Sequence, residues 1–267
     1  MPVRILHAHS TFSLGGKEAR GVRLMNAFGD RAEHAVLSGM PDQLSARSRI
    51  DPGIKVDFPK DAPALAGRPG LARLYRLSRY MRGFDLVLTY NWGSFDAVMA
   101  RHLFGGPPLV HHEDGFNEDE AERLKTSRNL YRRLGLSSAY RLVVPSLYLE
   151  RIARTVWGQP AERIVRIANG IEVARFAQPL AADAIPGFLK RPGELLVGTL
   201  AGLRAVKNLP RLVRAFAAMQ DRNARLVIVG EGPESERIMA EARACRVADR
   251  VLLPGFLGDP ARVVPAF

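Results

Sequence analysis

The chain has 267 residues, of which 47% are hydrophobic and 25% are charged, a composition typical of a folded protein with one large or two ordinary domains. No apolar run approaches the roughly 20 residues that a membrane-spanning helix needs. The single cysteine, Cys245, excludes an intramolecular disulfide and a multi-cysteine metal site, and it favours a reducing cytoplasm. The net charge of +12 predicts an acidic partner. The positive charges are spread along the chain without a long block, so nucleic acid is not the expected partner.

The first part of the chain alternates between short β-rich runs and helical patterns. Strands are predicted at residues 3–9, 33–38, 54–58, 84–91, 107–112, 140–146 and 163–170. Helices are predicted at residues 17–28, 68–81, 94–104 and 119–136, with one more between the last two strands. Apolar strands that alternate with helices favour a parallel sheet covered on both faces and joined by right-handed crossovers.

The alternation stops over residues 171–192, which contain three prolines and predict a linker, and it then resumes. Further strands are predicted at 194–202, 224–232 and 250–256, and helices at 208–219, 234–245 and from 258. In the last of these, Asp259 is the expected N-cap and Pro260 the first helical residue. Three strands are too few to close a doubly wound core and would leave apolar surface bare. We therefore expect a cut-down version of a longer protein; the alternative is a small complete domain with a frayed end.

Two cations, Arg204 and Lys207, lie between a strand and the helical pattern that Asn208 and Pro210 open. Ligands of open α/β sheets bind at the carboxyl ends of strands, beside helix N-termini whose free N–H groups favour phosphate. Arginine grips phosphate oxygens as a fork, and lysine adds a point charge. The pair predicts a phosphate site; the alternative is a solvated basic turn.

Six short motifs in strand-end loops extend this interpretation. They are 15-GGKE-18, 144-VPS-146, 169-NGIEVARF-176, 202-GLRAVKN-208, 230-GEGPE-234 and 254-PGF-256. Together, and in this order, they resemble the retaining glycosyltransferases of family 4. That resemblance implies the GT-B fold, an α/β architecture of two Rossmann-like, doubly wound parallel-sheet domains. The expected domains are an acceptor-side domain at 1–170, the linker at 171–192 and a partial donor-nucleotide domain at 193–267.

The resemblance implies transfer of a sugar from a nucleotide-diphosphate donor to a glycan or lipid-linked acceptor, in bacterial surface polysaccharide or glycolipid synthesis. It implies no metal and no cofactor beyond the donor substrate, because Arg204 and Lys207 would neutralise the leaving diphosphate. The implied donor-binding residues are Gly15, Gly16, Arg204, Lys207, Asn208, Gly230, Glu231 and Gly232. Many family members carry an arginine at the position of Gly202, and Arg204 is the expected substitute, since residues two apart on an extended segment point the same way.

A second departure from the family pattern lies in 109-LVHHEDGFNEDE-120. Aligned with the family's Thr-x-His, His112 takes the threonine position and Asp114 the histidine position, which makes both catalytic candidates. His111 and Glu113 would share the opposite face, with His111 structural. Adjacent strand residues cannot converge on one ion, so no metal site is expected here. The acidic residues Glu118, Asp119, Glu120 and Glu122 are expected to cap and solvate the next helix.

Acceptor-binding candidates are Asn91 and Trp92 at the end of another strand, and Glu18 in the glycine loop. An exposed tryptophan can stack on a sugar ring while an asparagine bonds its hydroxyls. The alternative is that Trp92 packs in the core. Likewise, the glycine loop could be an ordinary helix-capping turn.

The basic helical segments 68–82 and 123–134 make an anionic membrane surface a candidate partner, with the protein peripheral on the inner membrane face. The alternative is that they simply solvate one helix face. The family normally adds two glutamates beyond the last residue here, so a second functional hypothesis is an inactive or partner-dependent GT-B fragment that binds nucleotide sugar weakly. A third is a nucleotide-sugar epimerase of similar architecture, against which the 169–176 and 202–208 motifs count.

Overall fold

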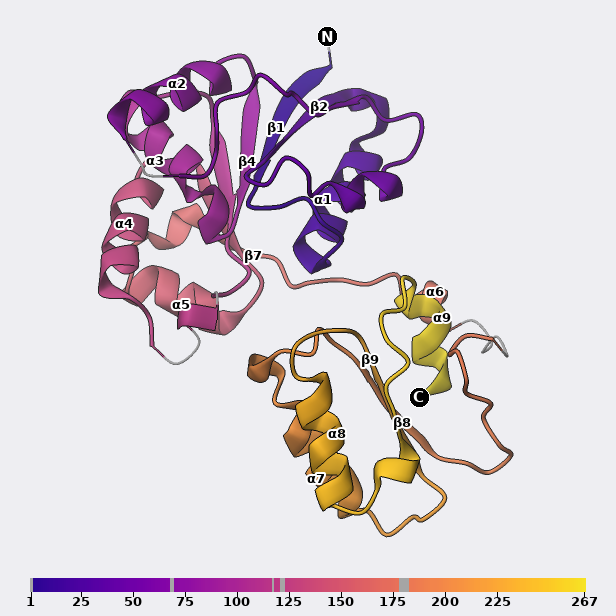
Figure 1. Ribbon diagram of the computed structural model, residues 1–267. Coiled ribbons are helices and arrows are strands. Elements are labelled where there is room, and N and C mark those ends of the chain that lie inside the picture. The colour runs from indigo at the N-terminus through magenta and orange to yellow at the C-terminus, as the bar shows by residue number, and fades with distance from the viewer. Residues whose placement is uncertain (1, 68–69, 117, 121–122, 178–182) are drawn as a thin grey trace. The chain divides into compact units, whose positions relative to one another are not determined.

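The computed structural model describes residues 2–67, 70–116, 118–120, 123–177 and 183–267. The chain divides into two compact units, Met1–Asn169 and Gly170–Phe267. Each unit is built on its own parallel sheet (Figure 1). No helix in the described residues is long and apolar enough to cross a membrane.

The first unit contains a seven-stranded sheet in the order β3-β2-β1-β4-β5-β6-β7, with every pair of neighbours parallel. The strands are β1 (Val3–His9), β2 (Ala32–Ser38), β3 (Val56–Asp57), β4 (Leu86–Tyr90), β5 (Leu109–His112), β6 (Arg141–Val144) and β7 (Ile164–Arg166). The order reverses between β1 and β4, and this is the point at which open α/β sheets bind ligands.

Helices cover both faces of this sheet (Figure 1). They are α1 (Gly16–Phe28), α2 (Leu71–Met81), α3 (Phe95–Phe104), α4 (Thr126–Leu136) and α5 (Leu147–Thr155). Alternate strand residues point to opposite faces. Leu6 and Ala8 therefore enter the main core, to which α2–α5 contribute, while Ile5 lies on the other face, where α1 packs.

The second unit has a three-stranded parallel sheet in the order β10-β9-β8. Its strands are β8 (Leu196–Leu200), β9 (Arg225–Val229) and β10 (Val251–Leu252), and its helices are α6 (Val173–Phe176), α7 (Leu209–Ala217), α8 (Ser235–Ala244) and α9 (Pro260–Val263). Side chains of α7 and α8 form a core with one face of the sheet.

The other face of this small sheet is also covered, contrary to the expectation of a bare apolar face. Ile185 and Phe188 are buried there together with Val263 of α9, and the ring of Phe267 lies against Gly198 of β8. The segment at 171–192, expected to be a linker, therefore contributes core side chains to the second unit, because its few apolar residues fit the face opposite α7 and α8.

The largest difference from the predicted elements lies at 119–136. Only Thr126–Leu136 forms an α-helix, and Glu118–Glu120 forms a separate 3-10 turn. The Glu120 carboxylate accepts a hydrogen bond from the backbone N–H of Lys125 at 3.2 Å, so it caps α4 from outside the helix. The predicted cap of the last helix is confirmed, because Asp259 Oδ1 accepts from the N–H of Ala261 at 3.1 Å.

Candidate active site

Polar side chains gather at the carboxyl ends of β1, β4 and β5 in the first unit. Arg20 of α1 donates to both carboxylate oxygens of Asp114, with Nη1–Oδ1 at 2.6 Å and Nη2–Oδ2 at 2.7 Å. Its Nη1 also donates to Oδ1 of Asn169, the last residue of this unit, at 3.1 Å. Asp114, one of the two catalytic candidates of this strand end, is thus the acidic half of a bidentate pair, and such pairs fix geometry as well as charge.

Asn91 holds the loop that follows β5. Its side-chain Oδ1 accepts from the N–H of Asp114 at 2.8 Å, and its own N–H donates to the carbonyl of His112 at 2.8 Å. It does so with φ of 57°, in the left-handed region that side chains other than glycine rarely adopt. Asn91 therefore positions Asp114 through its amide oxygen. Its contact with an acceptor sugar stays a prediction.

A stack of buried rings lies beneath α1, and we call His7, His9, Tyr90 and His112 the histidine–tyrosine stack. The Tyr90 ring lies 4.1 Å from that of His9 and 4.8 Å from that of His112, nearly parallel to both. His7 Nδ1 lies 3.1 Å from the Tyr90 hydroxyl. Gly21 of α1 leaves room for the stack, because a side chain there would contact the His9 ring.

The histidines of the stack are held neutral. Burial, with the nearby Arg20 and His111, lowers the pKa of His112 to about 4. Burial, with Lys17 and His112, lowers the pKa of His9 well below its ordinary value. Within the described residues, His112 Nδ1 and both ring nitrogens of His9 have no hydrogen-bond partner. His112 is thus a neutral and almost fully buried catalytic candidate, with 8% of its surface exposed.

The glycine loop leads into α1, whose first turn contains the buried acid Glu18. Gly15 is the N-cap, and a side chain there would press against Glu18 Oε2 at 2.8 Å, while Gly16 has open space around its Cα. Lys17 Nζ lies 3.3 Å from Glu18 Oε1 and donates to Ser10 Oγ at 2.7 Å. Glu18 is only 3% exposed, and burial raises its pKa. In this structure Glu18 is therefore withdrawn from the surface, and its predicted contact with the acceptor stays a prediction.

Trp92, the other predicted acceptor contact, is engaged by the protein itself. Its ring stacks on Phe95 at 5.5 Å, and the guanidinium groups of Arg128 and Arg132 lie 4.9 and 5.0 Å from it. The structure favours the alternative weighed above, in which Trp92 packs against the core.

Arg132 is fully buried and pairs with acidic residues on the face of β5 that lies opposite His112. It pairs with Glu113 at 3.3 Å and with Glu120 at 3.1 Å, and His111 lies 3.7 Å from Glu113. His111 and Glu113 thus share one face of β5 and its extension, while His112 and Asp114 share the other, as the strand alternation predicts. Glu120 caps the next helix as predicted, but it does so as a buried partner of arginine, so the expectation that it is solvated is wrong. Glu122 lies outside the described residues.

In the second unit, the predicted cations lie in the loop between β8 and α7. Arg204 is extended and Lys207 ends a 3-10 turn at Ala205–Lys207; both are exposed. Neither side chain makes a hydrogen bond or ion pair with any other described residue. Asn208 follows in the left-handed conformation, with φ of 48°, and begins α7. Two cations without intramolecular partners at a strand end can bind an anion without first breaking a salt bridge.

The glycines of the GEG turn are required by the chain's own packing. Gly230 and Gly232 have φ of 142° and 154°, and a side chain on either would collide with the carbonyl oxygen of Ala201 or Leu203. The N–H of Leu203 donates to the carbonyl of Glu231 at 2.9 Å, so this turn supports the cation-bearing loop. The two glycines, named above as implied donor contacts, thus let this turn pack closely against the loop after β8.

Two α/β units built on parallel sheets, with polar and cationic groups at the strand ends, are the architecture of GT-B glycosyltransferases. Comparison of the sequence with protein families identifies the family. A family model described as Glycosyltransferase Family 4 matches residues 14–175, and one described as Glycosyl transferases group 1 matches residues 183–264. The chain belongs to glycosyltransferase family 4, and the predicted family and fold class are confirmed. A comparison with curated protein sequences gave no match.

Solved structures with the same fold include glycosyltransferases and an epimerase. Anabaena HepE in complex with UDP and glucose is 18% identical, with a TM-score of 0.72 over 99% of this chain and 72% of that chain. Sucrose-phosphate synthase from Thermosynechococcus elongatus is 17% identical, with a TM-score of 0.69 over 98% of this chain and 72% of that chain. A UDP-N-acetylglucosamine 2-epimerase is 15% identical, with a TM-score of 0.53 over 99% and 72%.

Arg20 and Arg132 are the residues that sequence reasoning missed. Arg20 carries a usable signal, because it follows Lys17 by three residues on the helix that the glycine loop opens, and residues three apart share a helix face. Arg132 carries none, since it belongs to an arginine-rich segment in which nothing marks one member as buried.

Proposed function

We propose that this glycosyltransferase transfers a sugar from a nucleotide-diphosphate donor to a glycan or lipid-linked acceptor, with retention of anomeric configuration. The observation that carries the proposal is the pair Arg204 and Lys207, which are exposed at the end of β8 and have no side-chain partner among the residues that the structure describes. Bacterial surface polysaccharide or glycolipid is the proposed destination of the sugar. The complex of Anabaena HepE with UDP and glucose makes UDP-glucose the first donor to test.

The proposed chemistry assigns the leaving group to the second unit. As the bond between the anomeric carbon and the diphosphate oxygen breaks, negative charge grows on that oxygen, and fixed cations stabilise it more than they stabilise the ground state. Lys207 takes this role, and Arg204 grips the other phosphate oxygens. These two cations replace a metal ion, so transfer should survive EDTA. Asn208, Gly230, Glu231 and Gly232 are proposed to border the nucleotide.

The first unit is proposed to hold the transferred sugar and the acceptor hydroxyl. Asp114 contributes a negative group that favours an oxocarbenium-like transition state. Its bidentate pairing with Arg20 fixes the direction of the carboxylate. His112, held neutral, can exchange a hydrogen bond with a sugar hydroxyl without adding charge. Gly15 and Gly16 are proposed to admit the donor phosphate to the N-terminus of α1.

The test is a panel of nucleotide sugars, with UDP-glucose first, incubated with the full chain and with candidate acceptors. Nucleoside diphosphate release and the anomeric configuration of the product are followed by NMR. The account predicts transfer with retained configuration, lost in Lys207→Ala and kept in Arg211→Ala, a matched exposed cation on α7. An inverted product contradicts the retaining mechanism. Epimerised nucleotide sugar formed without acceptor indicates the epimerase hypothesis, and donor binding without turnover indicates the partner-dependent fragment.

The proposed substitution of Arg204 for the usual family arginine has its own test. Arg204→Ala and Lys207→Ala should each weaken donor binding, because both cations are proposed to face the same diphosphate. If Arg204→Ala leaves donor binding unchanged while Lys207→Ala abolishes it, Arg204 is not the substitute.

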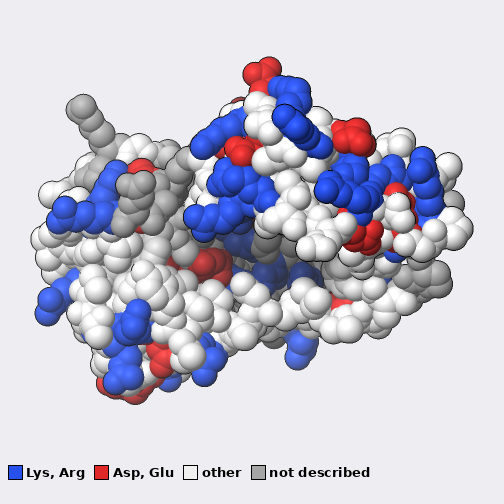
Figure 2. All heavy atoms as spheres, turned by 90° about the horizontal axis from the view of Figure 1, so that it is seen from below, with Lys and Arg blue, Asp and Glu red and all other residues white. Residues whose placement is uncertain are grey.

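We also propose that the protein works in the cytoplasm against an anionic membrane surface. Apolar side chains protrude from the basic helices: Leu71 and Tyr75 on α2, and Leu130 and Leu134 on α4, are 47–69% exposed. Lys and Arg side chains form several groups on the face seen in Figure 2. Protruding apolar side chains among cations are typical of interfacial helices.

Co-sedimentation with vesicles tests this membrane proposal. Binding should be strong to vesicles that contain phosphatidylglycerol, weak to neutral ones, and reduced by Leu130→Ser. Equal binding to both vesicle types, or binding to neither, contradicts the proposal.

A further inference from the structure

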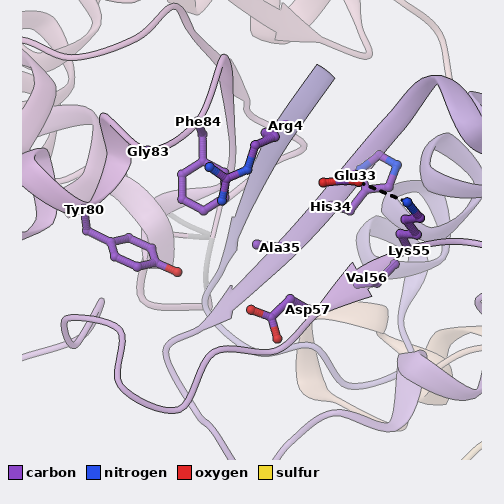
Figure 3. Close-up of a pocket in the computed structure, with 10 residues that line it drawn as sticks. All are labelled: Arg4, Glu33, His34, Ala35, Lys55, Val56, Asp57, Tyr80, Gly83 and Phe84. Atoms are coloured by element: carbon purple, nitrogen blue, oxygen red, sulfur yellow. Dashed lines mark hydrogen bonds and ion pairs between the residues drawn. The ribbon is translucent and has the colours of Figure 1, made fainter. Parts of the chain in front are cut away.

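A cavity of about 610 Å3 opens at the amino-terminal end of the sheet in the first unit (Figure 3). This volume falls within the range of small-molecule sites. The candidate active site lies at the other end of the same strands. Arg4 lines the cavity and His9 lies in the active site; they are five residues apart on β1, about 16 Å at roughly 3.3 Å per residue.

The floor of the cavity is formed by three neighbouring strands. Arg4 of β1 lies opposite Glu33 of β2, and Ala35 of β2 lies opposite Asp57 of β3. Because Glu33 and Ala35 are two residues apart, all four share one face of the sheet. The opposite wall of the cavity is formed by residues at and just after the end of α2.

That wall is aromatic. Tyr80 and Phe84 are both half-buried, their ring centroids lie 5.5 Å apart, and Figure 3 shows both rings directed at the strands. Gly83 between them adds no side chain to the wall. The two rings are inclined at 57° to each other, so a ring-shaped ligand can lie on one of them and contact the other.

The polar groups around these rings are largely unpaired. The Arg4 guanidinium lies 5.2 Å from the Phe84 ring centroid, and Glu33 is satisfied by Lys55 at 3.2 Å. Within the described residues, the guanidinium of Arg4, the carboxylate of Asp57 and the hydroxyl of Tyr80 have no hydrogen-bond partner. Burial and the nearby Asp57 raise the pKa of Tyr80, so its hydroxyl stays protonated and can donate.

These groups select a chemical class. Two cations and two carboxylates balance, so a simple anion or cation gains little from the cavity. Unpaired donors and an unpaired acceptor around an aromatic wall suit a ligand that is polyhydroxylated and has an apolar ring face, and a pyranose sugar has both. Hydrogen bonds to charged side chains are stronger than neutral ones, so Asp57 and Arg4 would supply much of the binding.

We infer that this cavity is a second saccharide-binding site, in which a sugar ring packs against the aromatic wall of Tyr80 and Phe84 and its hydroxyls bond to Asp57 and Arg4. The inference concerns binding alone, so it stands apart from the reaction proposed above. A site at this end of the sheet would hold a glycan without occupying the transfer site.

The test is an NMR titration of the full chain with glucose, glucuronate and maltose as probes. At least one probe should shift the amide resonances of Ala35, Asp57 and Gly83 with a single dissociation constant. The variants Asp57→Asn and Tyr80→Phe should each raise that constant by about tenfold, as expected for loss of a hydrogen bond in a site of this kind. Both changes are nearly isosteric.

Matched controls are Asp42→Asn and Tyr140→Phe, two exposed side chains outside the cavity, which should leave the dissociation constant unchanged. The inference is overturned if none of the three probes shifts these resonances, or if the cavity variants bind as the controls do. Shifts at the amides of Gly15 and Asp114 alone would place the saccharide in the candidate active site and also overturn it.

Discussion

Acidification should destabilise the first unit through the histidine–tyrosine stack. His112 has an ordinary pKa of 6.5, and burial, Arg20 and His111 lower it to about 4 in the folded state. As pH falls from about 6.5 towards 4, His112 therefore binds a proton in the unfolded chain but stays neutral in the folded chain. His112 contributes its full stability above about pH 6.5 and loses it across this window. At about pH 5 the loss is about 1.5 pK units at 1.36 kcal/mol each, or about 2 kcal/mol.

Other titrating groups act in the same window. Burial also lowers the pKa values of His7 and His9, which act in the same direction. Glu18 acts in the opposite direction: burial raises its pKa, so its contribution is present at low pH and is lost as pH rises. Comparing a variant with the parent at each pH cancels the contribution of Glu18 and leaves that of His112, together with its effect on the pKa values of His7 and His9.

The assay uses tryptophan fluorescence during urea unfolding. The chain has two tryptophans, Trp92 and Trp157, and both lie in the first unit, so the signal reports that unit alone. Between about pH 8 and pH 5, His112→Gln should lose about 2 kcal/mol less free energy of unfolding than the parent. His102→Gln, which changes a half-buried histidine of α3 that is not part of the stack, is the matched control. Equal losses in His112→Gln and the parent would refute the reasoning.

Three further outcomes follow from named contacts. Arg132→Ala removes the buried cation between Glu113 and Glu120, and only Glu120 keeps another arginine, Arg128, as a partner. The change should lower the free energy of unfolding by about 3–5 kcal/mol, measured by the same fluorescence; a loss below about 1 kcal/mol would contradict its role. Gly230→Ala forces a side chain against the Ala201 carbonyl and should speed hydrogen exchange in the β8 and β9 strands, so unchanged protection would argue against the clash. Arg20→Gln should lower kcat/KM by about tenfold or more. Because Arg20 and Asp114 act as a pair, the double variant with Asp114→Asn should lose no more than either single change, and additive losses would separate the two residues.

Much of the fold could be predicted because parallel strands buried on both faces appear as short apolar runs between helical patterns. The helix expected at 119–136 shows the limit of that signal. Its acidic beginning has the composition of a helix N-terminus, yet Glu120 binds Arg132 and closes the turn before α4 begins. A tertiary ion pair overrides local propensity here.

The candidate site also contains residues that local sequence predicts and residues that it does not. Arg204 and Lys207 could be predicted because both the cations and the loop that exposes them are local in sequence. The pairing of Arg20 with Asp114 spans 94 residues, and nothing local marks either side chain for the other. The same holds for Trp92: its position at a strand end leaves both exposure and core packing open, and the arginines that pack on its ring, Arg128 and Arg132, are distant in sequence.

The central claim is that Arg204 and Lys207 hold a donor diphosphate, and calorimetric titration with UDP and UMP tests it most directly. The two nucleotides differ by one phosphate, so the account predicts that the parent binds UDP more tightly than UMP. Lys207→Ala should remove most of that difference, and Arg211→Ala should preserve it. Equal affinity of the parent for UDP and UMP, or equal effects of the two substitutions, would contradict the claim.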